Sequence, residues 1–417
     1  MLINHIDKQI NILILSSVWV EPNSSAAGSR MLQLIHSFLA EGWRVTYAST
    51  SVGSEFAFDL SLLGVENATI QLNNISFDDF IVKLNPTIVL FDRFMMEEQF
   101  GWRVAEKLPN ALRILDTEDL HCLRKAREVA ITENKIFQET DILKTAIAKR
   151  EIASILRCDL SLIISKYEKD VLQNTFKIDS NILQYTPFLL DKINSLEILP
   201  KYLNRKDFYF IGNFLHKPNY DAVLYLKKEI WPLIAKKLPK SVLYIYGSYP
   251  SQKVLQLNNV KERFIIKGKI PNTSILKKHK VCLAPLRFGA GIKGKLTEAM
   301  QYGTPSVTTS IGAESMYGTL PWNGFIENKP VQFALASINL YTNAEVWEEA
   351  QKKGFEIINK IYNKELHSKL LIDKIKQLLP ALKLHREANF LGELLQYHTL
   401  KSTKYLSKWI EEKNHKK

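Results

Sequence analysis

Short apolar runs alternate with segments of helical periodicity along most of this chain. Residues 11–16 read NILILS, residues 26–42 carry apolar side chains at helical spacing, and residues 43–49 form a second short apolar run. Such runs predict parallel strands that are covered on both faces and joined by crossover helices. Further runs of this kind occur at 87–92, 113–116, 160–165, 208–212, 242–247, 281–285 and 305–309. The alternation predicts an α/β protein with doubly wound, Rossmann-like parallel sheets.

A polar stretch without periodicity separates two alternating series. The length of 417 residues predicts two or three domains. We expect an N-terminal Rossmann-like domain at residues 1–190, a linker at 191–207, a second Rossmann-like domain at 208–375 and C-terminal helices at 376–417. Two such sheets would face a cleft, and ligands of such sheets bind at the carboxyl ends of the strands. The loops that follow strands are therefore the places to look for a site.

Composition limits the class of protein and its compartment. The three cysteines are far apart in sequence and form no CxxC pair, which favours a reducing cytosol and excludes a cysteine-based metal site. The apolar run at residues 10–20 is too short to span a bilayer and does not resemble a signal peptide. We therefore expect a cytoplasmic protein. The net charge of +13 can attract a nucleic acid, an anionic membrane or a phosphorylated ligand, and it also fits a solvated lysine-rich surface.

The most informative loop is at residues 284–300, between a predicted strand and a predicted helix that begins near Ile292. It contains three glycines, Gly289, Gly291 and Gly294. Glycines allow backbone N–H groups to approach a ligand, and a helix N-terminus adds partial positive charge. Three full positive charges lie in the same loop, on Arg287, Lys293 and Lys295. This predicts a site for a diphosphate, with Glu298 one turn later to accept from ribose hydroxyls. The alternative is a flexible basic loop.

This segment, continued through residues 301–314, resembles the donor-binding region of glycosyltransferase family 4. The match rests on Glu298 followed by Ala-Met, and on the Gly-x-Pro turn at 303–305. The resemblance implies a GT-B fold and transfer of a sugar from a nucleotide sugar with retention of configuration. Many members carry a second glutamate eight positions before Glu298, where this chain has Ala290.

Two further loops resemble parts of the same family. Residues 208–222 are similar to the start of its C-terminal domain, where an arginine and a lysine often hold phosphates; here the candidates are Asn213 and Lys217. Residues 22–30 are similar to a small-residue loop near the donor phosphates and acceptor, which makes Gly28 and Arg30 candidates. The alternatives are a plain strand–turn–helix for the first loop, and for the second a helix start capped by Ser24 or Ser25.

The loop at residues 116–124 carries the candidate catalytic residues Glu118, Asp119 and His121. It resembles an N-domain segment that reaches the sugar across the cleft in related members. A histidine there can hydrogen-bond a sugar hydroxyl or the leaving phosphate, and a carboxylate can orient that histidine or accept a proton from the acceptor. The alternative is that Asp119 caps the next helix and that His121 is a surface residue.

No motif for a metal–diphosphate site or a histidine–cysteine metal site occurs. We therefore expect no metal and no cofactor, with a nucleoside-diphosphate sugar as substrate and positive side chains stabilising the leaving group. As the commonest role in the family, we expect a hexosyl or related transferase in cell-surface polysaccharide synthesis, with a glycan or lipid-linked acceptor. The alternatives are an inactive GT-B binding or scaffold protein, suggested by Ala290 and Asn213, and an enzyme whose acceptor is RNA.

The segment at residues 386–417 has apolar and aromatic residues near helical spacing, with lysines between them. Three interpretations remain open. By analogy with GT-B folds, the last helix would cross back to the N-terminal domain. A basic amphipathic helix could instead lie on an anionic membrane, at the inner face of the cell membrane. Aromatic and basic residues would also suit contact with RNA.

Overall fold

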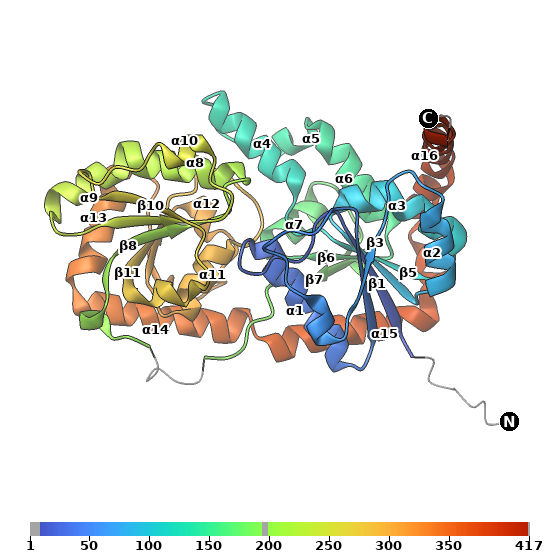
Figure 1. The fold of residues 1–417 in the computed structure, drawn as a ribbon, viewed down its shortest axis with the longest axis horizontal. Helices are drawn as coiled ribbons and strands as arrows, with labels where there is room; N and C mark the ends of the chain where they lie inside the picture. The colour runs from blue at the N-terminus through green and yellow to red at the C-terminus, as the bar shows by residue number, and fades with distance from the viewer. Residues whose placement is uncertain (1–8, 194–198, 416–417) are drawn as a thin grey trace.

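The computed structural model describes residues 9–193 and 199–415, without the side chains of residues 398–401. The expected N-terminal domain, linker and C-terminal helices therefore each include residues outside the described part, namely 1–8, 194–198 and 416–417. Figure 1 shows two α/β units side by side, with the helix at residues 344–361 running along the C-terminal unit and the helices that follow it along the N-terminal unit.

The N-terminal domain is built on a seven-stranded parallel sheet with strand order β3-β2-β1-β4-β5-β6-β7. The strands are β1 (Asn11–Ser16), β2 (Arg44–Ser49), β3 (Glu66–Thr69), β4 (Ile88–Asp92), β5 (Leu112–Asp116), β6 (Leu160–Ile163) and β7 (Leu183–Tyr185). The helices are α1 (Ala26–Ala40), α2 (Ser76–Leu84), α3 (Phe94–Lys107), α4 (His121–Thr132), α5 (Thr140–Leu143), α6 (Ala146–Arg157) and α7 (Lys166–Asn174). Short 3-10 turns lie at Leu60–Leu63 and Ser180–Ile182.

The C-terminal domain is built on a six-stranded parallel sheet with strand order β10-β9-β8-β11-β12-β13. The strands are β8 (Lys206–Ile211), β9 (Leu243–Tyr246), β10 (Phe264–Gly268), β11 (His279–Ala284), β12 (Ser306–Thr308) and β13 (Gly324–Ile326). The helices are α8 (Lys217–Tyr225), α9 (Trp231–Lys237), α10 (Gln252–Leu255), α11 (Gly294–Gln301), α12 (Ser310–Ala313), α13 (Pro330–Thr342) and α14 (Ala344–Ile361). A π-helical turn at Leu226–Ile230 joins α8 to α9, and 3-10 turns lie at Tyr202–Asn204 and Thr273–Lys278.

Each sheet has a buried hydrophobic cluster on both of its faces, which is why the central strands read as unbroken apolar runs. The expectation of two Rossmann-like doubly wound sheets is confirmed. The alternation of apolar runs and helical segments in the sequence does not predict β3. Its residues Glu66–Thr69 are mostly exposed and form a polar edge of the sheet. It also places the start of α11 near Ile292, whereas the helix begins at Gly294.

Two long helices return from the C-terminal domain to the N-terminal domain (Figure 1). Helix α15 (Lys364–Ala388) contributes Leu371, Ile375 and Leu382 to the hydrophobic cluster beneath β1 and β5. Helix α16 (Phe390–His415) then packs against α3 and α6. Within the described residues, no helix combines the length and the apolar character needed to cross a membrane.

Candidate active site

A cavity of about 590 Å³ lies between the two domains. Its lining includes most residues of four loops at the carboxyl ends of parallel strands in both sheets. These loops lie within residues 22–29 after β1, 118–121 after β5, 211–219 after β8 and 286–295 after β11. This is where doubly wound sheets bind ligands, and the volume suits a nucleotide-sized molecule.

The N-termini of three helices meet at this cavity. Residues at the starts of α1, α8 and α11 line it, including Ala26, Asn219 and Lys295. A Cβ atom added to Gly294 would lie 2.6 Å from the Cβ of Ala26, so a side chain at residue 294 would push the two domains apart. Because each helix start presents unpaired N–H groups and partial positive charge, this end of the cavity favours an anion.

Lys293 and Lys295 add full positive charge at the start of α11. Both line the cavity, and both donate to neutral oxygens: Lys293 Nζ to the Gly291 carbonyl at 2.6 Å, and Lys295 Nζ to Asn219 Oδ1 at 2.6 Å. Burial lowers the pKa of each lysine to about 8. A diphosphate in the cavity would stabilise the charged form of both side chains.

Glu298 lines the same cavity one turn further along α11. Burial raises its pKa to about 7, against the opposing effects of a hydrogen bond from Thr273 and the charge of Lys295. Asn213 also lines the cavity, and its Nδ2 lies 3.4 Å from the Ser24 carbonyl of the N-terminal domain. The structure therefore brings Asn213, Gly289, Gly291, Lys293, Lys295 and Glu298 together at one wall.

The opposite wall carries Glu118, Asp119 and His121. Asp119 forms an ion pair with Arg124, and His121 Nε2 lies 3.5 Å from Asp119 Oδ1. Burial alone would raise the pKa of Asp119, but the charge and hydrogen bond of Arg124, together with the neighbouring His121 and His216, outweigh burial and lower the pKa. Burial lowers the pKa of His121 to about 4, so its ring is neutral at neutral pH. His121 can then donate one hydrogen bond and accept another.

Glu118 has the most unusual environment of the three. Its backbone has a positive φ of 61°, and among the described residues its Oε1 atom is buried without a hydrogen-bond partner. Burial and then the charge of Asp116 raise its pKa well above the usual value. A strained backbone that holds an unpartnered carboxyl at a cavity wall is typical of functional sites.

The start of α4 is held by carboxylates that are distant in sequence. Glu151 accepts from the backbone N–H groups of His121 and Cys122, each at 2.8 Å, and Glu168 accepts from that of Leu120 at 2.8 Å. The alternative that Asp119 caps this helix is therefore wrong. His121 is also not a surface residue, since only 13% of its side chain is exposed.

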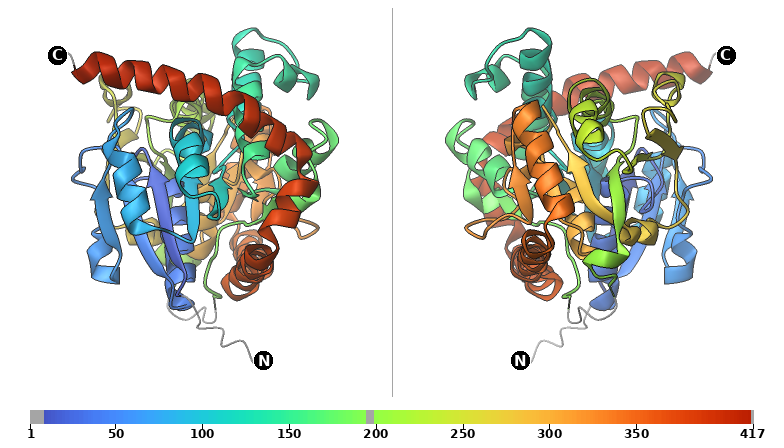
Figure 2. Two further views of the ribbon diagram at one scale, coloured as in Figure 1. Left: turned by 90° about the vertical axis from the view of Figure 1, so that its right-hand side faces the viewer. Right: turned by 90° about the vertical axis from the view of Figure 1, so that its left-hand side faces the viewer.

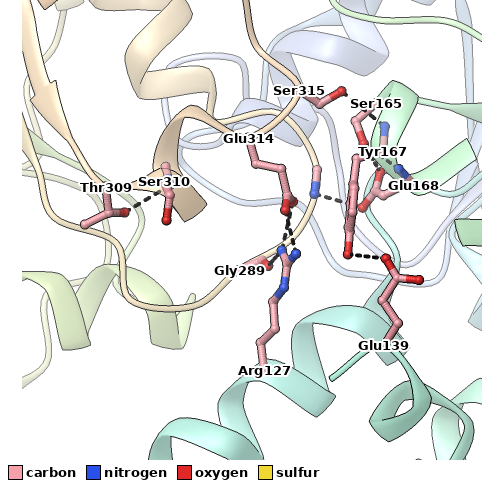
Figure 3. A network of polar contacts seen from close by, with 12 residues as sticks. Arg127, Glu139, Ser165, Tyr167, Glu168, Gly289, Thr309, Ser310, Glu314 and Ser315 are labelled. Atoms are coloured by element: carbon pink, nitrogen blue, oxygen red, sulfur yellow. Dashed lines mark hydrogen bonds and ion pairs between the residues drawn. The ribbon is translucent and has the colours of Figure 1, made fainter. Parts of the chain in front are cut away.

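Sequence reasoning missed a polar network that joins the two domains, shown in Figure 3. Arg127 on α4 forms a bidentate ion pair with Glu314, with N···O distances of 2.8 and 2.6 Å, and donates to the Gly289 carbonyl at 2.9 Å. Glu168 accepts from the Gly291 N–H at 2.8 Å. Because the partners lie more than a hundred residues apart, no local signal identifies them.

Two residues predicted to bind the donor do not line the cavity. The Arg287 guanidinium pairs with Asp221 instead, with 2.9 Å between Nε and Oδ2. Lys217 is 72% exposed and pairs with Glu128 of the N-terminal domain at 2.6 Å. Their roles in donor binding stay predictions, since sequence spacing in an irregular loop does not reveal which side chains line the cavity.

Gly28 and Arg30 do not line the cavity either, and their assignment to the acceptor and phosphate loop stays a prediction. A Cβ atom at residue 28 would lie 2.3 Å from the Glu21 carbonyl oxygen, so Gly28 allows α1 to pack against its own preceding loop. Arg30 is buried against Asp116 beneath the site. The alternative of a capped helix is confirmed for Ser25, whose Oγ accepts from the Gly28 N–H at 3.0 Å.

Among the described residues, no three histidine, cysteine, aspartate or glutamate side chains gather in a way that could hold a metal ion. The expected independence from metals and cofactors stays a prediction.

The arrangement of two facing Rossmann-like domains matches solved structures along nearly the whole chain. HepE from Anabaena, in complex with UDP and glucose, superposes with a TM-score of 0.64 at 11% identity and covers 88% of this chain and all of its own. The fold is GT-B. TarM from S. aureus, in complex with UDP and alpha-GlcNAc-glycerol, superposes with a TM-score of 0.55 at 17% identity and covers 71% of this chain.

Sequence comparison adds two findings to this GT-B fold. Residues 205–343, which make up most of the C-terminal domain, match the family model described as Glycosyl transferases group 1. An uncharacterised 44.6 kDa protein in the cps region of Klebsiella pneumoniae is 26% identical over 245 residues, which is 55% of this chain. The match spans 60% of the length of that curated relative, and the TarM match spans 57% of TarM.

Proposed function

We propose that this chain is a glycosyltransferase of family 4 that moves a hexosyl or related sugar from a nucleoside-diphosphate sugar to an acceptor hydroxyl. The observation that most supports this proposal is a pair of buried lysines, Lys293 and Lys295. They lie at the start of α11, in the cavity between the two domains of the GT-B fold. Neither ammonium donates to a carboxylate, so the cavity holds positive charge directed at a ligand. The match of residues 205–343 to group 1 glycosyl transferases supports the same reading.

In this proposal the diphosphate lies against Lys293, Lys295 and the N–H groups of the α11 start. Glu298 accepts hydrogen bonds from the ribose. These groups stabilise the negative charge that develops on the diphosphate as it leaves, which supports a mechanism without a metal. Bound UDP in the HepE and TarM structures supports a nucleoside-diphosphate donor.

The opposite wall would position the sugar. The neutral His121 ring would hydrogen-bond a sugar hydroxyl and Asp119 would orient that ring, while the Glu118 carboxyl at the same wall would hydrogen-bond another sugar hydroxyl. The acceptor oxygen forms a bond to the anomeric carbon on the face that the diphosphate leaves, which gives retention. The bond from that carbon to the diphosphate breaks with its electron pair on the diphosphate, and the acceptor proton passes to the diphosphate oxygen.

We propose a cell-surface glycan or lipid-linked saccharide as acceptor and the cytoplasmic side of the membrane as location. The relative encoded in the cps region and the glycerol glycoside bound to TarM support a role in polysaccharide synthesis. The second candidate function is a GT-B binding protein without catalysis, favoured by Ala290 at the position where many relatives have a glutamate.

Donor binding tests the proposal. We expect UDP or another nucleoside diphosphate to stabilise the protein, and Lys295→Met to weaken binding by about 1.5–3 kcal/mol, the value of a charged hydrogen bond. Lys217→Met is the matched control, because that lysine pairs with Glu128 and does not line the cavity. Equal affinities for both variants, measured by titration calorimetry, would remove the donor site from this cavity.

A measurement of turnover distinguishes a glycosyltransferase from a GT-B binding protein without catalysis. Wild-type protein that binds a nucleotide sugar should hydrolyse it slowly without an acceptor, and NMR of the released sugar should show the donor's anomeric configuration before mutarotation. Tight binding with no hydrolysis and no transfer would support the binding protein instead.

A further inference from the structure

The side of helix α16 that packs on the protein is mostly small or polar. Its buried and half-buried residues include Gly392, Gln396, Ser407 and Glu411, and among the apolar residues Leu395 and Ile410 are half-buried. A Cβ atom at residue 392 would lie 2.2 Å from the Leu156 carbonyl oxygen, so the glycine allows a close backbone approach. Gln396 Nε2 donates to the Arg157 carbonyl at 3.1 Å, and Glu411 pairs with the buried Arg103.

The opposite side of α16 carries large apolar residues that are exposed. They are Phe390, Leu391, Leu394, Tyr405, Leu406 and Trp409, with exposed fractions between 41% and 71%. At about 100° per residue these positions fall on one side of the helix, away from the buried ones. A helix that only packs against its own protein would bury this side. We call these six residues the outer face of α16.

We propose that the outer face of α16 docks the protein on an anionic lipid surface. The segment 390–417 carries six lysines and three glutamates, so its charge complements anionic headgroups. Tyrosine and tryptophan favour the boundary between headgroups and acyl chains, and leucines insert below it. Figure 2 shows that α16 runs along the outside of the N-terminal domain, where a flat surface can reach it.

The same residues argue against two other occupants. Three of the six side chains are leucines, which offer no ring on which a nucleotide base could stack. A second copy of the chain would bring two helices with a surplus of positive charge against each other. Both occupants remain outcomes of the test. The inference concerns a binding surface and does not rest on glycosyl transfer.

Vesicle co-sedimentation tests the surface with the full chain. We expect binding to vesicles of phosphatidylglycerol and phosphatidylcholine, and weaker binding to phosphatidylcholine alone. A triple variant, Leu394→Ser with Tyr405→Ser and Trp409→Ser, should bind the anionic vesicles at least ~10-fold more weakly, because it removes half of the inserted residues. The matched control substitutes serine for three apolar residues that are exposed elsewhere, Leu62, Leu203 and Val260, and should bind like the wild type.

A single variant keeps the test valid even if the triple variant unfolds. Bromine-labelled phosphatidylglycerol should quench the tryptophan fluorescence of the wild type, and Trp409→Phe should remove most of that quenching while co-sedimentation persists. No vesicle binding by the wild type, or equal loss in the control variant, would overturn the proposal. Two other results would also overturn the proposal: a dimer in analytical ultracentrifugation that Trp409→Phe abolishes, or binding to bulk tRNA that Trp409→Phe abolishes.

Discussion

Replacing Arg30 separates a structural from a ligand-binding role for this residue. Its guanidinium donates to Asp116 at 2.8–3.1 Å and to the Thr186 carbonyl at 2.6 Å, and only 1% of the side chain is exposed. Arg30→Ala would leave the Asp116 carboxylate buried without its partner and would leave the Thr186 carbonyl without its donor. The N-terminal domain should therefore lose stability, although the cavity lining is unchanged.

The expected magnitude follows from the cost of breaking a buried ion pair, about 3–5 kcal/mol. The free energy of unfolding of a domain is about 5–15 kcal/mol, so the expected loss is a large part of it. At roughly 2–4 °C per kcal/mol for a domain of this size, the melting temperature should fall by roughly 6–20 °C. Arg30→Lys should recover little, because an ammonium cannot reproduce the bidentate contact with Asp116.

Urea unfolding followed by circular dichroism measures the loss, and UDP titration of the folded variant measures the ligand role. The double variant Arg30→Met with Asp116→Leu serves as control and should recover part of the stability, since it removes both charges. An unchanged unfolding midpoint in Arg30→Ala, together with at least ~10-fold weaker UDP binding, would refute the reasoning and return Arg30 to the ligand site.

Three further predictions follow from the site and its surroundings. UDP affinity should fall as the pH rises through about 8, because Lys293 and Lys295 have a pKa of about 8 and lose their charge above it; a flat calorimetric profile over that range contradicts this. Gly28→Ala should lower the free energy of unfolding by about 1–3 kcal/mol, because its Cβ would lie 2.3 Å from a backbone oxygen; urea unfolding measures the loss, and an unchanged midpoint would mean that α1 shifts freely. Arg127→Ala should speed amide hydrogen exchange in the loop at residues 289–293, because it removes the contacts of Arg127 with Gly289 and Glu314, and unchanged exchange would show that these contacts do not restrain the loop.

The sequence predicts the elements of the fold better than the edges of its sheets. Buried central strands such as β1 and β4 are continuous apolar runs, because both of their faces are covered. The edge strand β3 reads Glu-Asn-Ala-Thr and is mostly exposed, so it gives no hydrophobic signal. Its position became visible only through its pairing with β2.

The sequence also predicts some parts of the candidate site better than others. The glycine-rich loop at residues 284–300 and the loop at 116–124 were predicted from residue type, and both lie at the cavity. Most residues named in those loops line the cavity, but Arg287 does not. Lys293 and Arg287 are six residues apart in one loop, yet only the lysine lines the cavity.

The sequence by itself determined two parallel α/β domains and a loop of glycines and lysines suited to an anion. These depend on local chemistry: the period of apolar residues, the freedom of glycine and the charge of lysine. Only the tertiary structure decided that Arg30 is a buried partner of Asp116, that Glu168 and Arg127 join the domains, and that α16 turns its apolar side outward. The physical reason is that these outcomes depend on partners far apart in sequence, and on which face of a helix meets the rest of the protein.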